Sequence, residues 1–138
     1  MIIDSSAVLA ILTNEPERPS MLEALSQGAP LVMSAATYLE AAIVVDGRMD
    51  PVLSRRYDEL LAAFDVQILD VTLAQARRAR EAYRDYGRGS ASTARLNFGD
   101  CFSYALASER DEPLLFKGND FRPTDLRSAL SGSTTCDT

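Results

Sequence analysis

Each of the three most apolar stretches of the chain contains one charged residue, and that residue is acidic. Asp4 lies in MIIDSSAVLAIL, Glu40 in LVMSAATYLEAAIVV and Asp100 in LNFGDCFSYALA. A carboxylate in apolar surroundings costs several kcal/mol unless a partner offsets its charge. None of the three stretches contains Lys or Arg. A metal ion is one partner that would meet this need.

Two of the three acids also have an interpretation that involves no metal. Asp4 is suited to cap the helix expected to follow it, and Asn97 and Asp100 have the spacing of a capping box. Capping and metal binding are compatible for both acids. Glu40 lies in the second turn after the expected N-cap Ser34, too late for capping, and its neighbours are apolar. Function is therefore the better explanation for Glu40.

A turn sequence near the C-terminus offers further oxygen atoms. Asn119 and Asp120 follow the apolar segment LLF and the dipeptide KG. Asn and Asp are common in turns for backbone reasons alone, so a turn and a ligand role are both open for these two residues. In open parallel sheets, ligands bind beyond the carboxyl ends of the strands. Asp4 is expected at one such end and Asn119 and Asp120 beyond another, which predicts one shared cleft.

Composition excludes several kinds of chemistry. The chain of 138 residues contains no histidine, which excludes His-dependent acid–base catalysis, Ser-His-Asp and Cys-His systems, and His-rich metal sites. Its two cysteines, Cys101 and Cys136, form neither a disulfide framework nor a zinc spacing. The net charge of −6 argues against binding a nucleic acid through bulk positive charge. Any such contact has to be local or assisted by a metal.

Basic residues are concentrated in one segment. Six of the 14 Lys and Arg residues lie between positions 77 and 95, around the Gly- and Ser-rich loop GRGSASTA. A solvated helix face explains most of them, while guanidinium groups beside a flexible loop also suit bidentate phosphate contacts. The candidates for such contacts are Arg77, Arg84, Arg88 and Arg95.

Short apolar segments alternate with helical patterns along the chain. Strands are expected at residues 1–3, 31–33, 66–69 and 114–116, and helices at 5–12, 18–27, 35–45, 50–64, 72–86 and 98–110. This alternation predicts an α/β fold built on a parallel sheet. Residues 1–130 are expected to form one domain and residues 131–138 a disordered tail. With no membrane span or secretory signal recognisable, a cytoplasmic protein is expected.

Together these segments resemble a PIN domain, and specifically the VapC toxins of bacterial toxin–antitoxin modules. The resemblance covers nearly the whole chain and rests on four motifs in order: DSSA at residues 4–7, SAATYLE at 34–40, LNFGDCF at 96–102 and LLFKGNDF at 114–121. Each motif is weak alone, but their order and spacing are specific. The resemblance implies a three-layer α/β/α sandwich with a short-stranded parallel sheet.

The same resemblance implies a magnesium- or manganese-dependent endoribonuclease, in which a metal-activated water hydrolyses RNA phosphodiester bonds in an acidic pocket. Asp4 and Asp100 match the acids that most directly hold metal, and Glu40 matches the second acidic position. The last acidic position falls at Asn119 or Asp120. Because Asn carries no charge, either Asp120 completes the catalytic set or three acids form it. The implied partners are an RNA substrate, a VapB-like antitoxin and a second copy of the chain in a homodimer, with no membrane.

Two other functions remain open at this point. A receiver-type phosphoacceptor domain would use Asp70 after VQIL and Lys117 after LLF, but such a domain has paired acids after its first strand, where this chain has Ser5 and Ser6. A non-catalytic binding module would use the acids only as helix caps. Binding of magnesium or manganese distinguishes a metal-dependent enzyme from the binding module.

Overall fold

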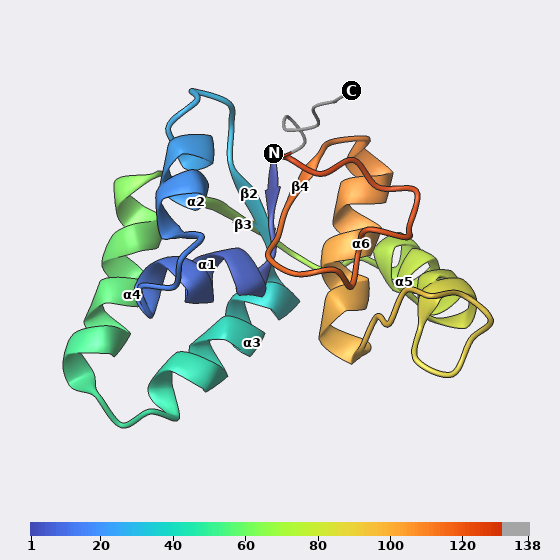
Figure 1. Cartoon of the computed structure of the whole chain (residues 1–138), viewed down its shortest axis with the longest axis horizontal. Coiled ribbons are helices and arrows are strands. Elements are labelled where there is room, and N and C mark those ends of the chain that lie inside the picture. The colour runs from blue at the N-terminus through green and yellow to red at the C-terminus, as the bar shows by residue number, and fades with distance from the viewer. Residues whose placement is uncertain (131–138) are drawn as a thin grey trace.

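A four-stranded parallel sheet forms the centre of the molecule in this computed structural model, which describes residues 1–130 (Figure 1). The strands are β1 (Ile2–Ile3), β2 (Val32–Ser34), β3 (Gln67–Leu69) and β4 (Leu114–Leu115), in the spatial order β3-β2-β1-β4. All three pairings are parallel. The predicted tail, residues 131–138, lies outside the described residues.

Six helices within residues 1–130 cover the two faces of the sheet. They are α1 (Ser5–Leu12), α2 (Arg18–Leu25), α3 (Ala35–Asp46), α4 (Pro51–Ala63), α5 (Leu73–Tyr86) and α6 (Phe98–Arg110). Helices α1 to α4 lie on one side of the sheet, and α5 and α6 lie on the other (Figure 1). The observed ends of the helices and strands agree with those expected from the sequence to within two residues. The helix expected at 18–27 ends early, at Leu25.

Alternating strand residues build two separate cores. Ile3, Met33 and Leu115 pack against α1 to α4, whereas the preceding residue of each strand faces α5 and α6. Successive side chains of a strand point to opposite faces, so even a two-residue strand contributes to both layers. Both faces of β1, β2 and β4 are therefore apolar and buried, as expected of a parallel sheet, whereas the edge strand β3 is largely exposed. This arrangement confirms the predicted three-layer α/β/α sandwich.

Two helices begin directly at the carboxyl ends of strands. Asp4 follows β1 and caps α1 by accepting a hydrogen bond from the Ser6 N–H, and Ser34 ends β2 and caps α3 through the Ala36 N–H. These abrupt strand-to-helix turns place the first turns of α1 and α3 at the same edge of the sheet, because β1 and β2 are parallel neighbours. The polar groups needed to start each helix thus accumulate at one edge.

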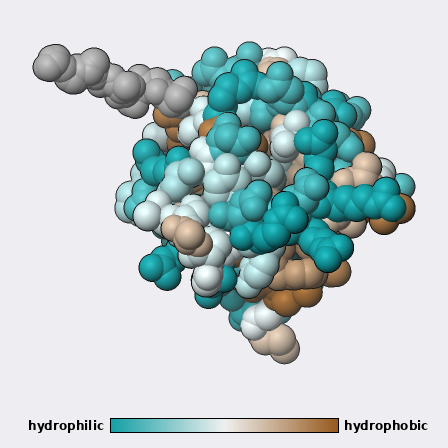
Figure 2. Space-filling model, turned by 90° about the vertical axis from the view of Figure 1, so that its right-hand side faces the viewer, coloured by the Kyte–Doolittle hydropathy of each residue, from teal (hydrophilic) through white to brown (hydrophobic). Residues whose placement is uncertain are grey.

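The surface over α5 and α6 is mostly hydrophilic, with apolar side chains gathered along one lower edge (Figure 2). Many of the polar side chains belong to α5, whose arginines are exposed. No helix within residues 1–130 has the length and apolar character that crossing a membrane requires.

Candidate active site

The carboxylate of Asp4 is fully enclosed and is held by hydrogen bonds from two serines. Its Oδ2 accepts from the Ser6 N–H at 3.1 Å and from the Ser6 hydroxyl at 2.7 Å. Its Oδ1 accepts from the Ser103 hydroxyl of α6 at 2.6 Å. Asp4 is 1% exposed. The predicted capping role of Asp4 is confirmed, and α6 supplies a second, distant anchor for the same group.

A buried hydroxyl on α3 extends this network. Thr37 Oγ1 lies 3.2 Å from Ser103 Oγ, and both residues are buried. Because Ser103 has one hydroxyl hydrogen and directs it to Asp4, Thr37 is the donor to Ser103. The Lys117 N–H donates to the Ser6 hydroxyl at 3.0 Å. Segments from α1, α3, α6 and the end of β4 thus meet around one carboxylate.

Asp100 lies in the first turn of α6 and forms the predicted capping box. Its Oδ2 accepts from the Asn97 N–H at 3.0 Å, and its own N–H donates to Asn97 Oδ1 at 2.8 Å. Burial raises the pKa of the Asp100 carboxyl from 3.8 to about 7, in spite of the hydrogen bond from Asn97. The negative charges of Asp4, Asp120 and Glu40 add to this rise. The four acids are therefore close enough to repel one another.

Glu40 projects from the middle of α3 toward the first turn of α6. Its Oε1 accepts from the Ser5 hydroxyl at 2.9 Å. Burial raises its pKa, the hydrogen bond from Ser5 opposes the rise, and the charge of Asp4 adds to it. The carboxylate of Glu40 occupies the space beside Gly99, where the Cβ of any other residue would overlap it.

Gly99 also belongs to the site, although none of the sequence motifs assigns it a role. The available signal was a glycine within the expected helix at 98–110, where glycine is about 1 kcal/mol less favourable than alanine. Such a residue needs a local reason, and here the reason is the approach of Glu40.

The two polar residues after β4 have different relations to this cluster. Asn119 and Asp120 are both exposed. The charge of Asp120 contributes to the raised pKa of Asp100, whereas Asn119 carries no charge. The backbone carbonyl of Asn119 accepts a hydrogen bond from the Arg122 N–H at 3.2 Å, as expected of a turn residue. Asp120 is thus the one that is electrostatically coupled to the other acids.

No cation neutralises the acids within residues 1–130. None of the ion pairs there includes Asp4, Glu40 or Asp100. The ammonium group of Lys117 instead lies 3.0 Å from Glu15 Oε1 and 3.7 Å from Glu17 Oε1. The chain therefore keeps its nearby cation out of the acidic cluster.

The position of Lys117 also argues against a receiver-type phosphoacceptor site. Asp70 follows β3, and Lys117 lies beyond β4. These two strands are at opposite edges of the sheet. The aspartate and lysine that such a site needs side by side are therefore apart.

The donor set has the chemistry of a site for a hard divalent cation. All of its ligating atoms are oxygens, three of its four carboxylates are at least partly buried, and they repel one another. Magnesium prefers such oxygen ligands. In the part of the chain that the structure describes, no three Asp, Glu, Cys or His side chains are arranged to hold an ion as they stand, because the carboxylates are turned toward serine hydroxyls and backbone N–H groups. The residues fit the ion in chemistry, and their side chains have to reorient to bind it.

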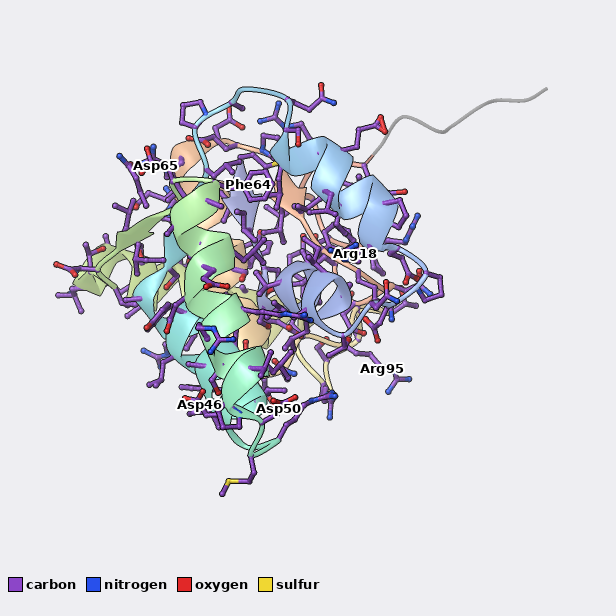
Figure 3. The ribbon with its side chains drawn as sticks, turned by 90° about the vertical axis from the view of Figure 1, so that its left-hand side faces the viewer. Arg18, Asp46, Asp50, Phe64, Asp65 and Arg95 are labelled. Carbon is purple, nitrogen blue, oxygen red and sulfur yellow. The ribbon has the colours of Figure 1, made fainter. Side chains whose placement is uncertain are left out.

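The four predicted arginines are exposed but do not form one cluster. Arg88 and Arg95 flank the base of the loop between α5 and α6, which is closed by hydrogen bonds from the Arg88 N–H to the Leu96 carbonyl at 3.2 Å and from the Leu96 N–H to the Tyr86 carbonyl at 3.1 Å. The side chain of Arg95 extends away from the ribbon (Figure 3). This pair adjoins the start of α6, where Asp100 lies.

The other two arginines are placed less favourably. Arg84 Nε lies 3.3 Å from Asp85 Oδ1. Arg77 lies in the first half of α5, next to Arg78, which donates to Ser108 near the last turn of α6. About eight residues of helix, roughly 12 Å, separate that turn from Asp100. The structure does not bring Arg77 to the acidic cluster.

A groove of about 610 Å³ lies apart from the acidic cluster, between α1, α2 and α4. Arg18 and Phe64 lie on this side of the molecule (Figure 3), and none of the four acids lines the groove. The acidic cluster is therefore identified by its charges and contacts rather than by the size of its cavity.

Comparison with known proteins finds relatives along almost the whole chain. Residues 1–126 match the family model described as PIN domain. Ribonuclease VapC28 of Mycobacterium tuberculosis is 52% identical over 130 residues, which cover 94% of this chain and 98% of that protein. Ribonuclease VapC of Mycolicibacterium smegmatis is 47% identical, covering 91% of this chain and 97% of that protein.

Solved structures share the fold at low sequence identity. Mycobacterium tuberculosis VapC20, described as a toxin that cleaves the sarcin-ricin loop, matches with a TM-score of 0.73 at 13% identity, covering 91% of this chain and 95% of that one. A toxin-antitoxin complex from Klebsiella pneumoniae matches with a TM-score of 0.68 at 17% identity, covering 90% and 92%.

Proposed function

The chain belongs to the PIN domain family, and we propose that it is a metal-dependent endoribonuclease, the toxin of a toxin–antitoxin module. Relatives of 47% to 52% identity that align along almost their whole length are named VapC ribonucleases. The observation that carries the proposal is the convergence of Asp4, Glu40 and Asp100 from three distant segments. No Lys or Arg among residues 1–130 forms an ion pair with any of them. Helix capping alone does not explain Glu40.

The acids of the cluster would hold the cofactor, magnesium or manganese. Asp4, Asp100 and Glu40 would be its ligands, and we propose Asp120 for the fourth acidic position because its charge reaches Asp100. When bound, a divalent ion supplies positive charge to a phosphate and lowers the pKa of water. The hydroxyls of Ser6 and Ser103 hold the Asp4 carboxylate in an orientation from which it would have to turn to bind the ion.

RNA is the proposed substrate, and its phosphates have to approach a protein with a net charge of −6. Neutralisation of the acidic cluster by the ion would remove the local repulsion. Arg88 and Arg95 are exposed and form no ion pair within residues 1–130. They are the arginines best placed to contact phosphates that flank the cleaved bond. An enzyme acting on cellular RNA would work in the cytoplasm.

A VapB-like antitoxin and a second copy of the chain are the proposed protein partners. One of the structures with the same fold is described as a toxin-antitoxin complex. For the homodimer, the chain offers exposed apolar side chains on α3, on the following turn and at the start of α4, namely Leu39, Ile43, Val44, Met49 and Val52. Light scattering of the purified chain tests the dimer, which an exclusively monomeric mass at micromolar concentration would rule out.

Cleavage of RNA by the purified protein tests the enzymatic proposal. Cleavage is expected with magnesium or manganese and not with EDTA. Replacing Asp100→Asn removes a charge, while the amide oxygen still accepts the capping hydrogen bond. Loss of roughly 4 kcal/mol of transition-state stabilisation would slow cleavage about a thousandfold. The control is Asp58→Asn, an exposed acid of α4, which should cleave normally. Near-normal metal-dependent cleavage by Asp100→Asn would contradict the assignment.

A further inference from the structure

Phe98 is an unusually exposed aromatic residue. It is the first residue of α6, and it is 78% exposed. Its ring meets that of Phe102, one turn further along the helix, edge to face, with centroids 5.1 Å apart and planes at 80°. A large apolar ring held at the surface by a second ring has one face left for another planar group.

Phe98 lies in the same turn of α6 as Asp100 but on the other side of the helix. Phe98 and Asp100 share the first turn of α6, but two residues along a helix point about 160° apart around its axis. Gly99, between them, lies against the carboxylate of Glu40. The ring therefore lies at the end of α6 where the acids converge, across the helix from Asp100.

Positive charge adjoins the ring on its N-terminal side. The loop between α5 and α6 returns to its base at Leu96, with Arg88 and Arg95 beside that closure. Only Leu96 and Asn97 separate Arg95 from Phe98. Along the chain, a basic loop, an exposed ring and the acidic Asp100 thus follow one another within a few residues.

We propose that Phe98 is a platform on which an unpaired base of the RNA stacks, a short distance along the strand from the phosphate that is cleaved. This inference rests on the proposed ribonuclease function and adds the contact that seats the strand. Aromatic side chains stack with every base, because every base has a π-face. Phe98 therefore favours single-stranded RNA at the site without selecting one base.

The experiment measures the affinity of the full chain for a short single-stranded RNA, with calcium in place of magnesium to suppress cleavage. Phe98→Ala should weaken binding about tenfold, whereas Phe98→Trp should retain it, because loss of stacking costs about 1.4 kcal/mol or more per base. The control is Leu73→Ala. Leu73 is a similarly exposed apolar residue, 65% exposed at the start of α5. It lies far from Phe98, because nearby Gln75 contacts Glu109 in the last turn of α6, at the opposite end of that helix.

RNAs that lack a single base sharpen this measurement. An abasic nucleotide at one position should weaken binding to the unchanged protein about as much as Phe98→Ala does. The two losses should not add when the abasic RNA is combined with the variant. Additive losses would place the contact of Phe98 elsewhere and overturn the stacking proposal.

Other outcomes separate this inference from the proposed function. Full affinity of Phe98→Ala, with the unchanged protein binding normally, would overturn only the stacking proposal. A loss of affinity accompanied by a change in molecular mass would assign Phe98 to a contact between two copies of the chain, which also overturns it. Absence of RNA binding by the unchanged protein would overturn both proposals.

Discussion

Replacing Gly99 by alanine is expected to displace the carboxylate of Glu40 and leave the fold intact. A Cβ at position 99 would overlap Glu40 Oε2 and would lie 2.5 Å from Cδ and 2.8 Å from Oε1, so the carboxylate has to move by about 1.5 Å to restore ordinary contact distances. No backbone atom outside α6 is among these closest neighbours. Because Glu40 is long and half-buried, its side chain can rotate away without a shift of either helix.

The expected change in stability is small. Glycine to alanine within a helix gains up to about 1 kcal/mol. Loss of the 2.9 Å hydrogen bond between Ser5 and Glu40 costs about 1 kcal/mol. The free energy of unfolding should therefore change by less than about 1 kcal/mol, which moves Tm by only a few degrees in a domain of this size.

The expected change in activity is large. A misplacement of about 1 Å in an active site can cost about 100-fold in rate, so Gly99→Ala should cleave RNA about 100-fold more slowly and bind manganese more weakly. The assays are cleavage at saturating RNA and manganese titration by calorimetry. Gly47→Ala is the control, because Gly47 also has a helical φ of −64° but lies at the far end of α3.

A double variant shows whether Gly99 acts through Glu40. If it does, Gly99→Ala should cost almost nothing further once Glu40→Gln is present, since both changes remove the same ligand. Normal manganese affinity and cleavage by Gly99→Ala would refute the reasoning, as would fully additive effects in the double variant.

Three further predictions concern the surroundings of the cluster. Burial raises the pKa of Asp100 from 3.8 to about 7, so the metal-free folded state holds more protons than the unfolded chain between these values, and stability falls as pH rises through them. At about 1.4 kcal/mol per pKa unit, reduced by partial solvation, Asp100 contributes about 2 kcal/mol to this fall in stability. Urea unfolding from pH 4 to 7 should therefore show a smaller fall for Asp100→Asn than for the unchanged protein. An identical fall in both proteins would contradict this prediction. Ser103→Ala removes the 2.6 Å donor to buried Asp4 and should cost about 1 to 3 kcal/mol of stability without metal; a loss below about 0.5 kcal/mol would show that Asp4 finds another donor. The Arg88→Ala, Arg95→Ala double variant should bind many RNAs more weakly and to a similar extent. The slope of log affinity against log salt concentration should flatten by roughly 0.7 per lost phosphate contact. An unchanged slope would show that both arginines are solvated surface residues without a role in RNA binding.

The helices and strands could be predicted from the amino-acid sequence, because their causes are local. The alternation of short apolar segments with helical patterns predicted the parallel sheet and its covering helices. Asp4, Ser34 and the Asn97–Asp100 pair marked the starts of helices, and all three caps are present. Each of these signals depends on residues within a few positions of one another. The same locality explains why the acids stood out, since each interrupts an apolar run.

The contacts that hold the acids, and the position of the cation kept away from them, depend on long-range packing. Ser103 reaches Asp4 across 99 positions of the chain, and Glu40 fits beside Gly99 only because α3 packs against α6. The side chain of Lys117 turns to Glu15 rather than to the cluster. Such contacts follow from the layer order and helix packing. Apolar residues of similar size are interchangeable in setting that packing, so no local pattern of residue types encodes it.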